Sequence, residues 1–105
     1  MRFIETPVFT RIATRIWSDE EYHALQLALF FRPELGAIIP GSGGLRKMRW
    51  SLRGKGKRGG IRLIYYWDLP SETFFMLYAY SKNEQGDLTA KQIRDLGRLV
   101  REEFQ

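Results

Sequence analysis

Apolar and polar side chains alternate at every second position in a stretch near the middle of the chain. Met48, Trp50 and Leu52 fall on one side of this stretch, and the cations Lys47 and Arg49 fall on the other. A period of two places successive side chains on opposite faces of a β-strand. The pattern therefore predicts a half-buried strand whose outer face is basic.

Two further stretches are typical of strands. Residues 61–67 are rich in β-branched and aromatic side chains, and residues 73–80 are apolar almost throughout. Alternation in the first of them gives one face Ile61, Leu63, Tyr65 and Trp67, and the other face Arg62, Ile64 and Tyr66. The glycines and cations of residues 53–60 predict a hairpin between the first two strands. The apolar run at residues 73–80 predicts a strand inside the sheet.

Two helices are indicated by their starting sequences. Ser18 with Glu21, and Thr89 with Gln92, have the spacing of a capping box. The neighbouring apolar pairs, Trp17 with Tyr22 and Leu88 with Ile93, are placed as hydrophobic staples. The first helix is expected to run from residue 19 to residue 32, because the following proline disfavours helical geometry in the residue before it. The second helix carries one apolar stripe, made of Ile93, Leu96, Leu99, Val100 and Phe104.

The order of these elements predicts the fold class. Residues 4–12 have mixed spacing and are interpreted as a first strand with a connection, and residues 36–44 are interpreted as a loop. The chain then reads strand, helix, three strands, helix. Consecutive strands joined by hairpins favour antiparallel pairing, since parallel pairing needs a crossover. We expect one α+β domain, residues 1–105, with a small antiparallel sheet flanked by an N-terminal and a C-terminal helix.

The composition excludes several kinds of chemistry. The 105 residues include no cysteine and one histidine, His23, so neither a disulfide framework nor a typical zinc site is available. We expect no metal and no cofactor. No stretch approaches the ~20 apolar residues that span a bilayer, and cations interrupt the first 16 residues. The expected location is the cytoplasm, with no membrane partner.

The charge distribution points to an anionic partner. The formal net charge is +5 and the sequence pI is about 9.8. Between Leu35 and Trp67 there is no acidic residue, although this window contains Arg46, Lys47, Arg49, Arg53, Lys55, Lys57, Arg58 and Arg62. Like charges gathered this closely repel one another unless a polyanion neutralises them. Tyr66 and Tyr80 fall near these cations, and aromatic faces stack on unpaired bases. Single-stranded RNA fits this combination better than duplex DNA.

Three sequence segments carry a resemblance to a known family. They are the run at residues 43–49, the glycine-rich run at residues 54–60 that leads into residues 62–66, and residues 80–84 before residues 87–89. Together with the element order, these segments make the chain resemble the RelE superfamily of type II toxins, and within it the HigB-like branch. The resemblance covers nearly the whole chain. It implies a small sheet like that of microbial ribonucleases, and metal-independent cleavage of mRNA in the ribosomal A site.

The resemblance also implies residue roles. Lys47 and Arg49 match the two basic positions on the family's second strand, and Arg62 matches the arginine that opens its third strand. Asn83 and Thr89 depart from the arginine and the tyrosine that RelE carries at these positions.

The proton acceptor and the proton donor remain open from the sequence. Lys47 and Lys57 are the candidate bases, because crowding by other cations lowers the pKa of a lysine. The candidate acid is Lys82 or a cation of the loop at residues 55–58, and Lys82 is favoured over Tyr80. The predicted catalytic residues are thus Lys47, Arg49, Lys57, Arg62 and Lys82. The predicted RNA-binding residues are Arg46, Arg53, Lys55, Arg58, Tyr66 and Tyr80.

The expected partners follow from the same resemblance. They are the ribosome with its mRNA, a cognate antitoxin encoded by the neighbouring gene, and operator DNA through the complex with that antitoxin. A second function stays open on the same fold, namely a non-catalytic toxin that inhibits the ribosome or gyrase by binding, as ParE toxins do. Fold alone does not distinguish the two.

Overall fold

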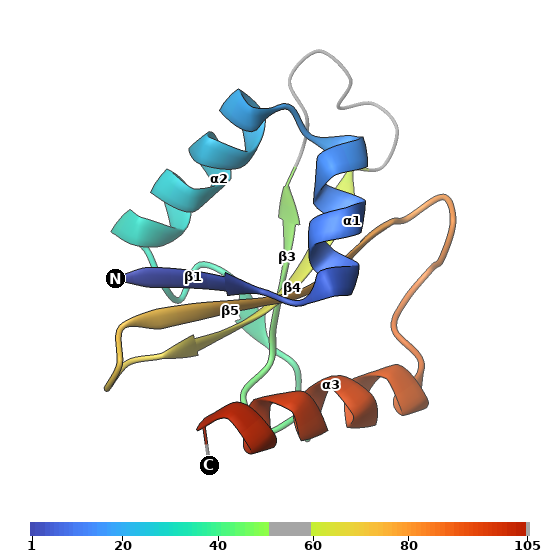
Figure 1. Ribbon diagram of the computed structural model, residues 1–105. Helices are drawn as coiled ribbons and strands as arrows, with labels where there is room; N and C mark the ends of the chain where they lie inside the picture. The colour runs from blue at the N-terminus through green and yellow to red at the C-terminus, as the bar shows by residue number, and fades with distance from the viewer. Residues whose placement is uncertain (51–59, 105) are drawn as a thin grey trace.

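The computed structural model describes residues 1–50 and 60–104 of the chain. The chain begins with β1 (Arg2–Glu5), α1 (Pro7–Ile16) and α2 (Asp19–Phe31). Four strands and a helix follow, namely β2 (Ala37–Ile38), β3 (Arg46–Trp50), β4 (Ile61–Asp68), β5 (Thr73–Ser81) and α3 (Ala90–Phe104). The predicted α+β class is confirmed (Figure 1).

The five strands form one mixed sheet in the order β1-β5-β4-β3-β2. The three pairs among β2, β3, β4 and β5 are antiparallel, but β1 pairs with β5 in parallel. The prediction of a purely antiparallel sheet is therefore wrong at this edge. Residues 6–72 separate β1 from β5, so no short hairpin constrains the direction of this pair. The apolar strand β5 lies inside the sheet, as predicted.

The N-terminal segment contains a helix that the sequence pattern did not predict. Thr6 is the N-cap of α1, its hydroxyl oxygen accepts a hydrogen bond from the Phe9 backbone at 3.0 Å, and Pro7 occupies the first helical position. Both residue types are favoured at these positions. The predicted loop over residues 36–44 also contains a short strand, β2.

Both predicted capping boxes are present. Ser18 and Glu21 bond each other's backbone amides at 2.8 and 3.1 Å. Thr89 and Gln92 do the same at 2.9 and 3.1 Å. The staple next to the first box is a stack of Trp17 on Tyr22, with ring centroids 6.0 Å apart. The two helices therefore begin where the sequence predicts, with their first amides satisfied.

The sheet separates two apolar clusters. Phe9, Leu25, Leu63 and Phe74 belong to the cluster between the sheet and the pair α1 and α2. The second cluster lies between the sheet and α3, and its buried members are Leu45, Ile64, Phe75, Leu77, Tyr80 and Val100. Figure 1 shows α1 and α2 on one side of the sheet and α3 on the other. The alternation predicted for β3 and β4 is confirmed, because odd and even positions of β4 enter different clusters.

Within the described ranges, no helix is both long enough and apolar enough to cross a membrane.

Candidate nucleic-acid interface

A row of cations crosses the sheet on the face that α3 covers in part. Arg49 on β3 is the register partner of Arg62 on β4, and Arg62 is in turn the register partner of Tyr80 on β5. Residues directly opposite each other on neighbouring strands share a face of the sheet. Arg49, Arg62 and Tyr80 therefore lie side by side across three strands. Arg49 is exposed, Arg62 is partly exposed and Tyr80 is buried.

A second row lies one step along the same strands. Lys47 on β3 is paired with Ile64 on β4, and Ile64 is paired with Tyr78 on β5. Since alternate residues of a strand share a face, Lys47 lies on the same face as Arg49. The two rows place three cations and two tyrosines together, and we call Lys47, Arg49, Arg62, Tyr78 and Tyr80 the cationic patch.

An irregularity in the pairing of β4 with β5 contributes to the placement of the two tyrosines. Ile64 is paired with Tyr78, but the next residue, Tyr65, is paired with Met76. Leu77 is therefore an extra residue without a direct partner on β4. A bulge of this kind changes the direction of side chains and occurs frequently at functional sites. It brings Tyr78 and Tyr80 to the face of the cations, where their rings stack with centroids 5.8 Å apart.

The connection between β5 and α3 adds a carboxylate to the patch. The Asp87 Oδ1 atom accepts a hydrogen bond from Lys47 Nζ at 3.2 Å, and the Asp87 side chain remains largely exposed. The pKa of Asp87 is lowered first by a hydrogen bond from the Leu88 backbone amide, then by Lys47, with a smaller contribution from Arg62. Asp87 is therefore an ionised hydrogen-bond acceptor beside the cations.

Tyr80 has the opposite character. Its side chain is 4% exposed, and among the described residues its hydroxyl group has no hydrogen-bond partner. Burial raises the pKa of the Tyr80 phenol, the negative charge of Asp87 raises it further, and Arg62 lowers it. The phenol therefore keeps its proton at neutral pH. An unsatisfied buried hydroxyl costs free energy, and such groups in folded proteins call for an explanation.

Side-chain amides hold the connection in place. The Tyr78 hydroxyl donates to Gln85 Oε1 at 3.3 Å, and Gln85 Nε2 donates to the Asp87 carbonyl at 2.9 Å and to Gln92 Oε1 at 2.6 Å. Gln92 is also part of the capping box of α3. The segment that carries Asp87 is thus anchored to β5 at one end and to α3 at the other.

The structure brings together only part of the predicted site. Lys47, Arg49, Arg62 and Tyr80 meet in the cationic patch. Lys82 is exposed in the turn after β5, one position beyond the end of the strand. Arg53, Lys55, Lys57 and Arg58 lie outside the described residues.

Two predicted RNA-binding residues lie elsewhere. Arg46 lies on the opposite face of the sheet from Lys47, where it donates a hydrogen bond to the Gly36 carbonyl at 2.7 Å and pairs with Glu34. Tyr66 is on the face of the patch but four residues along β4 from Arg62, and its ring packs on Phe104 near the end of α3. Both side chains have structural contacts that keep them apart from the cationic patch.

Asp87 was missed by the sequence analysis. The segment at residues 87–89 was noted as part of the family resemblance, yet no role was assigned to its carboxylate. The available signal was its position directly before the capping box of a helix that follows the cationic strands. Thr89 caps α3, because its hydroxyl oxygen accepts a hydrogen bond from the Gln92 backbone amide at 3.1 Å.

The sequence matches no model of a known protein family. The chain is an α+β domain with a cationic, tyrosine-lined face. Its function is therefore argued from the chemistry of the patch.

Proposed function

We propose that this protein is a toxin of the RelE type, which cleaves mRNA on the ribosome without a metal ion. One observation carries the proposal: Arg49, Arg62 and Tyr80 form a continuous row across three strands, with Lys47 and Asp87 beside it. Two guanidinium groups next to an ammonium group are suited to a phosphodiester, because an arginine donates to two phosphate oxygens at once.

The patch and the neighbouring Asp87 together contain a group for each step of RNA cleavage. The 2′-hydroxyl oxygen attacks the adjacent phosphorus, its proton passes to an acceptor, the bond from phosphorus to the 5′ oxygen breaks, and that oxygen receives a proton. The products are a 2′,3′-cyclic phosphate and a 5′-hydroxyl. Arg49 and Arg62 stabilise the negative charge that grows on the phosphorane oxygens.

We assign the proton acceptor to Asp87 rather than to Lys47. Lys47 donates a hydrogen bond to the Asp87 carboxylate, so it acts as a charged donor. Asp87 is the ionised carboxylate next to the cations, and an ionised carboxylate has only acceptor sites. A general base within hydrogen-bond reach of the proton contributes about 10²–10⁴-fold to the rate.

We assign the proton donor to Tyr80 in preference to Lys82. The Tyr80 hydroxyl is buried next to Arg62 and keeps its proton, whereas Lys82 lies in the exposed turn beyond the strand. In this proposal a phosphodiester becomes the hydrogen-bond partner that the Tyr80 hydroxyl lacks among the described residues. After cleavage, the phenolate regains a proton from the Asp87 carboxyl through water.

The patch lacks the histidine that small ribonucleases commonly use, because the one histidine of the sequence, His23, lies on α2. Such a site depends on receiving its substrate in the reactive geometry, which contributes much of the rate when two groups are held in place. We therefore propose the ribosome as the partner that positions the mRNA in the cytoplasm. A cognate antitoxin with an acidic segment would be attracted by the same charges, and operator DNA would be reached through that complex.

Primer extension on a translated message tests this function. With ribosomes present, we expect new 5′ ends within codons, and we expect none when ribosomes are omitted. Asp87→Asn should lower the yield of cut message by at least about 10²-fold. The matched control is Asp95→Asn, which removes a carboxylate on α3 that is paired with Lys91. An intact message on stalled ribosomes would instead favour the non-catalytic, ParE-like toxin.

A further inference from the structure

A second feature lies next to the cationic patch, at the edge of the sheet. It is a cavity of about 470 Å³ between α1, the last residues of β5 and the turn that follows β5. Its lining includes Ile16 of α1, Tyr78 and Tyr80 of β5, and Gln85 of the connection. Arg15 and Glu84 also line it, from α1 and from the turn. The volume falls in the range of small-molecule sites.

The topology of the sheet creates this cavity. β1 pairs only with the first part of β5, from Thr73 to Met76. Beyond that point the chain turns into α1, and the Thr6 hydroxyl donates a hydrogen bond to the Leu77 carbonyl at 2.8 Å. A helix cannot follow a strand edge as closely as another strand does. Space is therefore left along β5 from Tyr78 onward, and the turn closes it on the far side.

The cavity and the cationic patch share two tyrosines. Tyr80 is the register partner of Arg62 and also lines the cavity, and its ring stacks on Tyr78. Gln85 lines the cavity and holds the backbone of Asp87. When Arg49 and Arg62 hold the phosphate of a nucleotide, its base can therefore reach the cavity. Aromatic rings are the usual platforms for unpaired bases.

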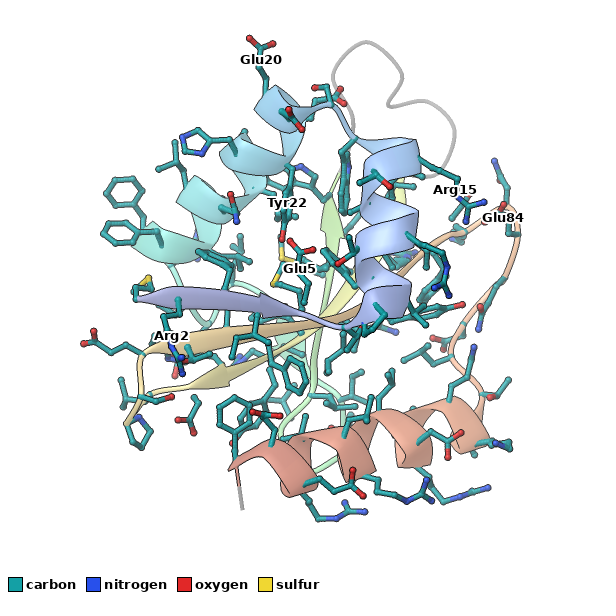
Figure 2. All side chains as sticks on the ribbon, viewed as in Figure 1. Arg2, Glu5, Arg15, Glu20, Tyr22 and Glu84 are labelled. Atoms are coloured by element: carbon teal, nitrogen blue, oxygen red, sulfur yellow. The ribbon has the colours of Figure 1, made fainter. Side chains whose placement is uncertain are left out.

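The polar groups of the cavity determine which base fits. Gln85 is already occupied, because its oxygen accepts from Tyr78 and its nitrogen donates to Gln92 and to Asp87. Glu84 and Arg15 are both exposed, and in the described part of the chain they form no ion pair with each other. Figure 2 shows them at the same end of the molecule, Arg15 on α1 and Glu84 on the turn. The cavity thus offers one carboxylate acceptor and one guanidinium donor.

Guanine matches this pair better than the other three bases. It has two adjacent donors on its Watson–Crick edge, N1–H and the N2 amino group, and two acceptors, O6 and N7, on its other edge. A carboxylate binds the first pair and a guanidinium binds the second. Adenine, cytosine and uracil each offer no more than one donor group on the Watson–Crick edge.

We propose that this cavity binds a guanine base of the RNA next to the scissile phosphate, with Glu84 and Arg15 as the residues that select it. The proposal rests on the proposed function for the position of the phosphate. It names a specificity site that is separate from the residues assigned to cleavage, so the two are tested separately.

Binding of mononucleotides tests the cavity without any cleavage. Guanosine 3′-monophosphate and adenosine 3′-monophosphate would each be titrated into the intact protein, with chemical shifts or calorimetry as the readout. We expect guanosine 3′-monophosphate to bind about tenfold more tightly, the discrimination typical of a bidentate contact to a base. Glu84→Gln should reduce this ratio, because the neutral amide keeps only one acceptor oxygen for the two guanine donors. Equal affinity of the two nucleotides for the wild-type protein would overturn the proposal.

Two control variants make the same changes of charge at positions outside the cavity. Glu103→Gln removes an exposed carboxylate from the far end of α3, and Arg11→Gln compares with Arg15→Gln on the same helix. Neither control should change the guanosine ratio, whereas Arg15→Gln should reduce it. If Glu103→Gln lowers the ratio as much as Glu84→Gln does, the effect is one of net charge and the cavity is not the site.

The cleavage map separates this proposal from the proposed function. If the wild-type protein cuts translated mRNA next to guanine and Glu84→Gln loses this base preference, both proposals hold. Cutting with no base preference at the cavity position, unchanged in Glu84→Gln, overturns the cavity alone. No cutting, together with selective binding of guanosine 3′-monophosphate, overturns the proposed cleavage but not the base site.

Discussion

Arg62 is the central residue of the cationic patch. It lies between Arg49 on one neighbouring strand and Tyr80 on the other, and it contributes to the electrostatics of Asp87 and Tyr80. Arg62 is half-buried as a whole, and arginines in such positions commonly bury the aliphatic portion of the side chain. A residue in this position serves the chemistry of the patch more than the packing of the core.

Replacing this arginine should separate activity from stability. We expect Arg62→Ala to abolish cleavage of translated mRNA and growth inhibition, because the phosphate loses a bidentate donor. The free energy of unfolding should change by no more than about 1 kcal/mol, since the loss of a partly exposed contact is offset by relief of repulsion from Arg49. Urea denaturation and primer extension on the same preparation measure both effects.

The control for this prediction is Arg98→Ala on α3. Arg98 is exposed and paired with Asp95 at 3.3 Å, away from the patch. This variant should keep full activity. Unfolding of Arg62→Ala under native conditions would show that Arg62 has a structural role.

Among the elements, α1 contributes three residues to the lining of the cavity beside the patch. This helix replaces a strand beside the second half of β5, and its position forms one wall of the cavity. Its link to the sheet is the buried Thr6, whose hydroxyl caps the helix at Phe9 and bonds the Leu77 carbonyl. One side chain thus fixes both the start of the helix and its docking on β5.

Removing the Thr6 hydroxyl should loosen this attachment. We expect Thr6→Ala to lower the free energy of unfolding by about 2–3 kcal/mol, from about 1 kcal/mol for the lost cap and 1–2 kcal/mol for the unsatisfied Leu77 carbonyl. Thr6→Ser keeps the hydroxyl and should stay within about 1 kcal/mol of the wild type. Chemical denaturation of the three proteins provides the comparison. Equal stability of the alanine and serine variants would contradict the role assigned to Thr6.

At the scale of the whole molecule, three tyrosines link the stability of the fold to alkaline pH. Burial is the largest cause that raises the pKa of Tyr22, Tyr65 and Tyr80. They lie at different places in the fold, and Tyr22 donates to Glu5 on β1 from α2, as the labelled side chains in Figure 2 show. A folded-state pKa raised above the ordinary value of 10.0 gives stability that is fully present below pH 10 and is lost as the pH rises further.

This linkage predicts how the protein unfolds in alkali. As the pH rises above about 10, which is the ordinary pKa of tyrosine, Tyr22, Tyr65 and Tyr80 should keep their protons while the circular dichroism of the folded state persists. These three phenols should ionise together with unfolding. Ultraviolet absorbance of tyrosinate and circular dichroism, recorded on the same samples, measure the two processes. Ionisation of more than two tyrosines in the folded protein would contradict the burial of these side chains.

Local structure in this protein follows from short stretches of sequence. Capping boxes at Ser18 and Thr89 predicted where α2 and α3 begin, because a cap depends only on residues three positions apart. Strict alternation predicted the faces of β3 and β4, since the strand period is fixed at two. Alternation also separated Lys47 and Arg49 from Met48 within β3 and Arg62 from Leu63 within β4, and the register of the two strands then placed the three cations on one face.

Pairings and contacts between residues distant in the chain arise only in the tertiary structure. The parallel pairing of β1 with β5, the helix that follows β1 and the resulting cavity come from contacts about 70 positions apart, such as Thr6 with Leu77. The connection before α3 brought Asp87 to Lys47 across 40 positions. Local periodicity does not encode such contacts, because their free energy exists only once the sheet and its two apolar clusters have formed.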